Sequence, residues 1–163
     1  IDTMSSIASA FSNFADMPAQ QSETLNVPKV IKLALDIFRE RNIAFAKADQ
    51  EILAKFDRTQ LIRVVTNLVK NAIQATKNTT DPKIFVDVQS VHNTVQITVS
   101  DNGIGITEEN TSKIFEPKFT TKNSGMGLGL AMVKNIMETY NGTITFTSEE
   151  GKGTVFTVTF PKD

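Results

Sequence analysis

The sequence predicts an α+β fold of two layers, in which a mixed, mostly antiparallel sheet carries helices on one face. Residues 83–90 with 94–100, and 142–148 with 154–160, alternate in period two around turn-forming stretches, which is the pattern of β-hairpins. Three amphipathic helical segments accompany them, and packing helices on one face of such a sheet buries both kinds of apolar surface. At 163 residues, 40% of them hydrophobic, the chain fits one domain with one core.

The first segment, residues 1–17, carries apolar side chains at helical spacings of three and four, and Pro18 ends the pattern. The stripe consists of Ile1, Met4, Ile7, Phe11 and Phe14. A helix this short is marginal by itself, so it needs a partner, either this domain or another helix. The first residue is not a methionine and already belongs to this stripe, so we expect a fragment of a longer protein. We divide it into 1–20, a helix end with a linker, and 21–163, the globular domain.

The globular domain is predicted to start with short strands around a helix. Residues 24–27 read as a strand, and Pro28 suits an early position of the helix that follows at 29–41. Two further strand candidates lie at 42–48 and 52–56.

The clearest helix covers residues 58–76, with Asp57 as its predicted N-cap. Its apolar face consists of Leu61, Val64, Val65, Leu68 and Ala72. Bordering that face is an arc of amide side chains, which are Gln60, Asn67, Asn71 and Gln74. Because Asn67 and Asn71 are four apart, they lie on one face, and amide oxygens can ligate Mg²⁺ beside a substrate phosphate. The alternative is that these amides are merely solvated.

Asp101 directly follows the predicted strand 94–100 and precedes Gly103 and Gly105. A carboxylate at a strand end is a fixed acceptor that suits the exocyclic amine of adenine. The glycines would let the backbone approach a planar ligand. The alternative is an ordinary Asp-Asn-Gly turn.

A second glycine cluster, Gly125, Gly127 and Gly129, runs into a helix predicted from about 127 to 140 and ended by Asn141–Gly142. Backbone N–H groups at such a helix start can bind phosphate without a basic side chain. The spacing fits neither a P-loop nor the dinucleotide fingerprint. The polar segment between the two clusters is too long for an ordinary loop, so we expect it to be functional.

In this order, the motifs resemble those of the sensor histidine kinase catalytic and ATP-binding domain, a member of the GHKL superfamily with the Bergerat fold of gyrase, Hsp90 and MutL. The resemblance covers nearly the whole chain. "NLVKNAIQA" resembles the N box, "DNGIGI" the first G box, "IFEPKFTTK" the F box and "GMGLGL" the second G box. The long polar segment would be the ATP lid.

The resemblance implies ATP and Mg²⁺ as cofactors. Asn71 would hold Mg²⁺, Asn67 would lie near the phosphates and Lys122 near the γ-phosphate, and these three would be the catalytic residues. Asp101 would bind the adenine amine, with Thr154 supporting it through a water. The other implied nucleotide contacts are Gly103, Gly105, Ile106, Phe115, Phe119, Thr121, Gly125, Gly127, Leu128 and Gly129. Phe115 and Phe119 would anchor or release the lid, or simply pack beneath it.

The implied enzyme is a protein histidine kinase that relays phosphate to a response regulator. The full-length protein would be a homodimer, and this chain a cytoplasmic domain of a membrane-anchored sensor. The acceptor helix is expected to be missing, because the single histidine, His92, lies in a hairpin turn. Residues 1–17 resemble the second helix of the dimerisation hairpin, and "FADMP" is similar to the nitrogen-regulation type.

The residue at position 67 distinguishes the histidine kinase interpretation from related functions. Hydrolases of the superfamily, and the anti-sigma serine kinases, carry a glutamate where this chain has Asn67, and an amide cannot take a proton from water. That favours a histidine kinase over a GHKL-type ATPase, while a nucleotide-binding module without catalysis remains open. A net charge of -1 gives no reason to expect nucleic acid, and the absence of cysteine excludes disulfides and thiolate metal sites.

Overall fold

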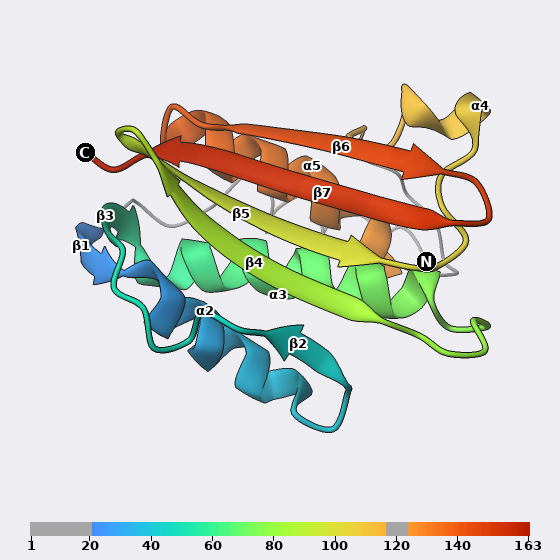
Figure 1. Cartoon of the computed structure of the whole chain (residues 1–163). Coiled ribbons are helices and arrows are strands. Elements are labelled where there is room, and N and C mark those ends of the chain that lie inside the picture. Colours follow the sequence, from blue (N-terminus) through green and yellow to red (C-terminus); the bar gives the residue numbers. More distant parts are fainter. Residues whose placement is uncertain (1–20, 117–123) are drawn as a thin grey trace, which may run out of the picture.

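The structure is a computed structural model that describes residues 21–116 and 124–163 (Figure 1). The helix predicted for 1–17 lies outside the described residues, and so do Phe119, Thr121 and Lys122. In chain order the elements are β1 (Ser22–Asn26), α2 (Val27–Leu35), the 3₁₀ helix η1 (Asp36–Phe38), β2 (Ile43–Phe45), β3 (Leu53–Asp57), α3 (Arg58–Ala75), β4 (Ile84–Val91), β5 (Thr94–Asp101), α4 (Glu108–Thr111), α5 (Ser124–Thr139), β6 (Thr143–Glu149) and β7 (Gly153–Pro161).

The predicted two-layer α+β architecture is confirmed. Within the described residues, five strands form the main sheet in the order β2-β4-β5-β7-β6, with β2 parallel to β4 and the other neighbours antiparallel. Figure 1 shows α2, α3 and α5 on one face of this sheet. Both predicted hairpins are present as β4–β5 and β6–β7, and His92 lies in the first turn with a φ of 55°.

One difference from the prediction is a second, two-stranded sheet formed by β1 and β3. It is joined to the main body by the backbone N–H of Lys55, which donates to the carbonyl of Lys162 at 2.8 Å. Period-two alternation predicts strands but does not say which strands pair, and for that reason the sequence did not separate the two sheets.

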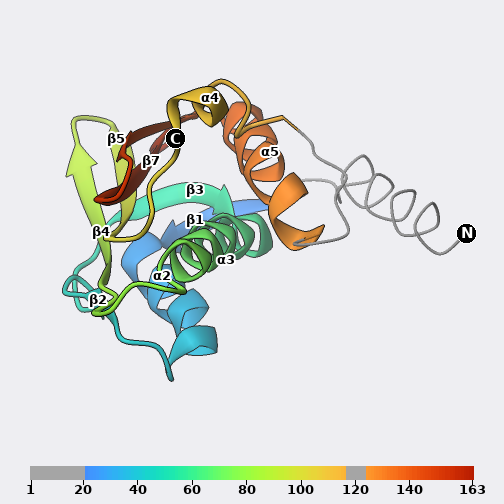
Figure 2. The same cartoon turned by 90° about the vertical axis from the view of Figure 1, so that its right-hand side faces the viewer.

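Helix α3 is the centre of the helical layer, between α2 and α5 (Figure 2). Its predicted apolar face is buried, with Leu61, Val64, Val65 and Leu68 at 0% exposure. This face packs with the inward residues of the sheet and of α5, which include Val86, Val88, Ile97, Ile136 and Met137.

The carboxylate of Asp57 makes two hydrogen bonds at the start of α3. Its Oδ1 accepts from the backbone N–H of Gln60 at 3.1 Å, which confirms the predicted N-cap. Its Oδ2 accepts from the backbone N–H of Gln21 at 2.8 Å. One buried side chain therefore holds both the first turn of α3 and the first described residue of the chain.

Two helix boundaries differ from the prediction. The helix predicted for 29–41 begins at Val27 and leaves α geometry at Leu35, after which Asp36–Phe38 form η1 and Phe38 alone packs against the core. Within the predicted lid, residues 108–111 form the short helix α4. By contrast, α5 ends as expected, with Asn141 at a φ of 60° and the N–H of Gly142 bound to the carbonyl of Met137 at 2.7 Å.

Candidate functional site

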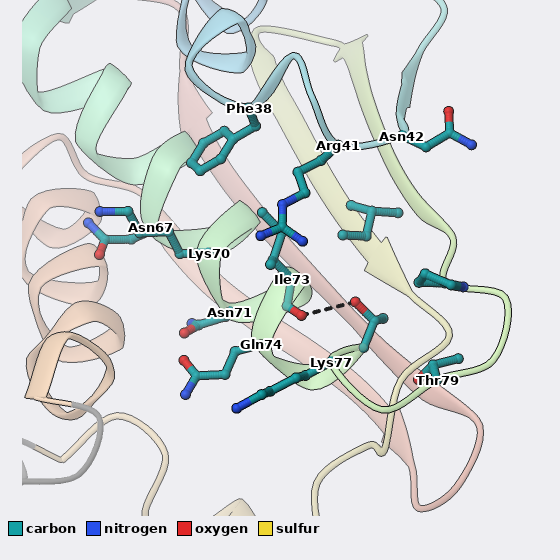
Figure 3. A pocket seen from close by; sticks show the side chains of 13 residues that line it. Phe38, Arg41, Asn42, Asn67, Lys70, Asn71, Ile73, Gln74, Lys77 and Thr79 are labelled. Atoms are coloured by element: carbon teal, nitrogen blue, oxygen red, sulfur yellow. Dashed lines mark hydrogen bonds between the residues drawn. The ribbon is translucent and has the colours of Figure 1, made fainter.

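The second half of α3 carries the two predicted asparagines. Asn67 is half-buried, and its Nδ2 donates to the carbonyl of Arg63 at 2.8 Å. Asn71 is only 8% exposed, and its buried Nδ2 has no hydrogen-bond partner among the described residues. An unsatisfied buried amide costs about 1–3 kcal/mol, so it marks a place where an acceptor is missing. Figure 3 shows Asn67, Asn71 and Gln74 extending from the helix in the same direction.

The second glycine cluster reaches this helix through Gly129. A Cβ placed on Gly129 would lie 3.0 Å from Oδ1 of Asn67, so a side chain at this position would press on the amide of Asn67. Gly125 and Gly127 fall in the first turn of α5, where backbone N–H groups have no partner within the helix. Gly129 lies two positions beyond that turn, so close packing is the role that its geometry indicates.

Asp101 is the last residue of β5, and its side chain turns back onto the loop that follows. One carboxylate oxygen accepts from the backbone N–H of Gly103 at 2.9 Å. Burial raises the pKa of Asp101 above its ordinary value, against the opposing effect of hydrogen bonds from the backbone of Gly103 and Thr154. The carboxylate is therefore held in place but incompletely satisfied, since one oxygen can accept a further donor.

The first glycine cluster packs against protein backbone. A Cβ on Gly103 would lie 2.3 Å from the carbonyl oxygen of Ala75, and the N–H of Ile104 donates to the same oxygen at 3.1 Å. Gly105 has a φ of 74°, and a Cβ on it would lie 2.4 Å from the carbonyl oxygen of Glu149. These contacts explain why both positions require glycine whether or not a ligand binds. The loop is held against the C-terminal end of α3 at Gly103 and against the end of β6 at Gly105.

Ser148 was missed by sequence reasoning and lies at the centre of a small polar network. Its hydroxyl accepts from the backbone N–H of Ile106 at 2.8 Å and lies 2.9 Å from the hydroxyl of Thr154, which is 4% exposed. A signal was available, because Ser148 continues the inward positions of Ile144 and Phe146 along β6 and is the polar member of that series. The network joins two predicted site residues, Ile106 and Thr154.

Asn102 and Gly153 were also missed. The side chain of Asn102 donates to the carbonyl of Asp81 and accepts from the N–H of Lys83, both at 2.8 Å, so it holds the loop before β4. Gly153 has a φ of 134°, and a Cβ there would lie 2.0 Å from the carbonyl oxygen of Asp101. Both residues support the position of Asp101 without facing a cavity of their own.

Phe115 packs at the edge of the core. Its ring meets Phe146 edge-on at 5.9 Å between centroids, and Nζ of Lys134 lies 5.8 Å from its centre. The packing interpretation of Phe115 is therefore supported, and a role as an anchor for the lid stays a prediction. The side chain of Leu128 lies outside what the structure describes, as do Phe119, Thr121 and Lys122.

Taken along α3, three of the predicted motifs meet on one helix. Gly129 contacts Asn67, the partnerless Asn71 follows one turn later, and Gly103 contacts Ala75 one turn after that. The separation from position 67 to position 75 is about 12 Å at 1.5 Å per residue. Thr154 is paired in register with Asp101 across β5 and β7, at the Ala75 end.

An open cavity of about 760 Å³ lies beside this half of α3 (Figure 3). Asn67, Asn71 and Gln74 line it, but Asp101, Gly103 and Thr154 do not. The cavity extends instead toward η1 and β2, where Phe38 and Arg41 line it. It therefore contains only the asparagine end of the predicted site.

A two-layer α/β sandwich with these motifs meeting on its central helix defines the class of the GHKL catalytic domains. Residues 56–163 match the family described as "Histidine kinase-, DNA gyrase B-, and HSP90-like ATPase". The chain belongs to that family, whose members are ATP-binding domains.

Similar proteins include Sporulation kinase B of Bacillus subtilis, 32% identical over 159 residues that cover 93% of this chain and 37% of that protein. Sensor histidine kinase ZraS of Escherichia coli is 42% identical over 123 residues, covering 76% of this chain and 26% of its own length. The chain thus spans well under half of the curated relatives that it matches.

Among solved structures, the nucleotide-free catalytic domain of histidine kinase ThkA is similar with a TM-score of 0.74 and 34% identity, over 87% of this chain and 98% of that one. ThkA in complex with the response regulator protein TrrA is similar with a TM-score of 0.80 and 27% identity, over 99% of this chain and 48% of that one.

The described residues contain neither a candidate membrane span nor an acidic or histidine cluster suited to a metal. No helix there has the length and apolar character needed to cross a membrane. Nor do three or more His, Cys, Asp or Glu side chains gather there in a way that would hold a metal ion.

Proposed function

We propose that this chain is the ATP-binding catalytic domain of a sensor histidine kinase, which presents the γ-phosphoryl group of ATP to a histidine outside residues 21–163. The observation that carries the proposal is the meeting of three motifs on α3 around the buried, partnerless amide of Asn71. Family membership and the relatives named as sensor kinases support it.

At the Ala75 end of α3, Asp101 receives the adenine. Its second oxygen accepts the exocyclic amine. Thr154 is the register partner of Asp101 on β7, and its hydroxyl lies 2.9 Å from that of Ser148 on β6. A hydrogen bond to a charged group contributes about 1.5–3 kcal/mol, enough to favour adenine over a base that presents an acceptor there.

At the Asn67 end, the first turn of α5 receives the phosphates through the backbone N–H groups around Gly125 and Gly127. Lys122 adds a positive charge near the γ-phosphate. The remaining predicted contacts, Phe119, Thr121 and Leu128, belong to the lid and the start of α5.

Asn71 fits Mg²⁺ in one specific way. Its amide oxygen is the hard ligand, and its partnerless Nδ2 needs an acceptor such as a phosphate oxygen. A single amide cannot hold the ion alone, so phosphates and waters complete the shell. When bound, Mg²⁺ neutralises charge on the transferring phosphoryl group.

The chemistry is transfer rather than hydrolysis. The bond between the γ-phosphorus and the bridging oxygen of ATP breaks, a phosphorus–nitrogen bond to the acceptor imidazole forms, and ADP leaves. The loose transition state needs positioning and charge neutralisation, which Asn67 and the N–H groups supply. A GHKL-type ATPase needs a base to activate water, and the amide of Asn67 cannot serve as one.

We propose the remaining features of the kinase by analogy with its relatives. The ThkA complex supports a response regulator as the downstream partner. Residues 1–20 are proposed as the end of a dimerisation helix and 21–163 as the catalytic domain, in a homodimer anchored at the membrane. His92, exposed in a hairpin turn, is not the acceptor.

Incubation with γ-labelled ATP tests the proposal. The chain alone should neither release phosphate quickly nor label itself. Adding the dimerisation hairpin of the full-length protein should give an acid-labile, alkali-stable phosphate on the hairpin histidine. A His92→Ala variant is the control and should behave as the parent chain. Rapid phosphate release by the chain alone would favour a hydrolase, and labelling lost in His92→Ala would overturn the assignment.

A further inference from the structure

The cavity beside α3 has a second wall that the predicted nucleotide residues do not form. Beyond Asn67 and Asn71 it extends between the C-terminal half of α3 and the segment from η1 to β2. Figure 3 shows Asn42 and Thr79 on the side of α3 opposite to Asn67. We refer to this wall as the η1 wall, and its residues are Phe38, Arg41, Asn42, Ile73, Thr76, Lys77, Thr79, Pro82 and Ile84.

The floor of the η1 wall is apolar. Phe38 and Ile73 are partly buried against the core, and Ile84 is 6% exposed. Pro82 adds a rigid ring beside them. The η1 wall is part of an open cavity of about 760 Å³ that also includes Asn67 and Asn71, and an apolar floor with a few polar groups is typical of small-molecule pockets.

The charges at the cavity all have one sign. Arg41, Lys70 and Lys77 line it, and none of the described residues that line it is Asp or Glu. Within the described part of the chain, none of these three cations has an ion pair, whereas Lys47, Arg58, Lys83 and Lys152 do. The acids nearest in sequence are Glu40, which precedes Arg41, and Asp81, four residues beyond Lys77, and neither lines the cavity. An oxygen of Asp81 lies 3.7 Å from Nζ of Lys83.

We propose that the η1 wall binds a small organic anion with an apolar body, at a site separate from the nucleotide. The apolar body lies on Phe38, Ile73 and Ile84, and the anionic group lies between Arg41 and Lys77. ATP is not the occupant, because the adenine acceptor Asp101 does not line this cavity. The exclusion of ATP rests on the proposed function, whereas the apolar floor and the three unpaired cations are properties of the cavity itself.

Such a ligand would be coupled to the nucleotide through α3. Asn67 and Asn71 line the same cavity, so the phosphates of a nucleotide and the second anion lie near one another. Like charges repel, so each should weaken the other by the same modest factor without excluding it. The site is therefore a place where a metabolite can lower the affinity for ATP.

The test uses 8-anilinonaphthalene-1-sulfonate, an amphipathic anion that fluoresces in apolar surroundings, with the 163-residue chain. Binding is titrated at saturating ADP, so that the nucleotide site is filled. We expect saturable binding that Arg41→Gln and Lys77→Gln each weaken about two- to fivefold. Arg39→Gln, two residues from Arg41 and outside this cavity, is the matched control and should leave the affinity unchanged.

Amide chemical shifts locate the probe. We expect the largest changes at residues 38–43 and 76–80. Changes confined to 101–106 and 148–154, or complete loss of the probe with ADP, would place it in the nucleotide site and overturn the inference. Equal affinity in the parent chain and in Arg41→Gln would also overturn it. Nucleotide affinity, measured by calorimetry on the same variants, reports separately on the proposed function.

Discussion

At the scale of single residues, the side chains predicted to contact the nucleotide are held at a cost to the folded domain. Burial disfavours the charged form of Asp101, and the buried Nδ2 of Asn71 has no acceptor. Both features are unfavourable for folding and favourable for binding, because a ligand can supply a donor to Asp101 and an acceptor to Nδ2 of Asn71. Changing either residue should therefore move stability and affinity in opposite directions.

Asp101→Asn should weaken ATP binding by about 1.5–3 kcal/mol, the range for a hydrogen bond to a charged group. The same change should stabilise the domain at neutral pH. Because the folded pKa of Asp101 lies above its ordinary value of 3.8, the parent loses stability as pH rises from that value through the folded pKa. Asp101→Asn lacks this loss, so the difference in free energy of unfolding should grow with pH. Urea unfolding between pH 4 and 7 and calorimetry check both parts, and unchanged ATP affinity would remove the adenine role.

Asn71→Ala should reduce Mg²⁺-dependent ATP affinity far more than metal-free affinity, because the amide oxygen is the proposed ligand. Asn67→Ala serves as the comparison, since its role at the phosphates does not require the ion. Titrations with Mg²⁺ and with a chelator distinguish the two. Equal losses for Asn71→Ala in both conditions would assign the residue to packing.

Ser148→Ala should free the backbone N–H of Ile106, and losing this hydrogen bond costs about 0.5–1.5 kcal/mol. We expect faster hydrogen exchange at position 106 and weaker nucleotide binding. Thr147→Ala, on the exposed side of the same strand, is the matched control. If both variants exchange alike at position 106, the network around Ser148 does not hold this loop.

At the scale of elements, the contact between α3 and α5 determines the effect of replacing Gly129 with alanine. In an isolated helix, replacing an interior glycine with alanine stabilises by about 1 kcal/mol. Gly129 is interior to α5, yet a Cβ there would lie 3.0 Å from Asn67. The two effects have opposite signs, so a measurement can tell which one dominates.

We expect Gly129→Ala to lower both the melting temperature and the ATP affinity. In the Asn67→Ala background the obstructing amide is gone, so the same substitution should be neutral or stabilising. The double-mutant cycle should give a coupling free energy of about 0.5–3 kcal/mol, as for residues in contact. Additive effects of the two substitutions would show that Gly129 acts independently of Asn67.

Local sequence patterns predicted most of the helices and strands, because each of these elements is encoded by a short run of neighbouring residues. The alternation in 83–100 and 142–160 gave both hairpins, and the 3.6-residue period gave α3 with its cap at Asp57. The early end of α2 was not predicted, since it depends on which residues find a buried neighbour. Ordered motifs gave Asn71 and Asp101, but the bond between Ile106 and Ser148 joins residues 42 positions apart, which no local pattern encodes.

At the scale of the whole molecule, nucleotide binding should appear as added stability. A ligand that binds only the folded domain stabilises it by about 2.7 kcal/mol at a hundred times its Kd. We therefore expect the melting temperature to rise with Mg²⁺ and ATP, and to rise less in Asp101→Asn at equal nucleotide. A thermal scan that shows no shift for the parent chain would contradict binding of ATP to the folded state.

The two hydrogen bonds of Asp57 connect the backbone at Gln21 to helix α3. The chain at Gln21 and the first turn of α3 are attached to the same carboxylate, through bonds of 2.8 and 3.1 Å. A displacement of the backbone at Gln21 would therefore reach the first turn of α3, a helix of 18 residues. The far half of α3 carries Asn67 and Asn71, so a displacement at Gln21 would reach these asparagines through Asp57, which ends β3 and pairs with Ser22 of β1.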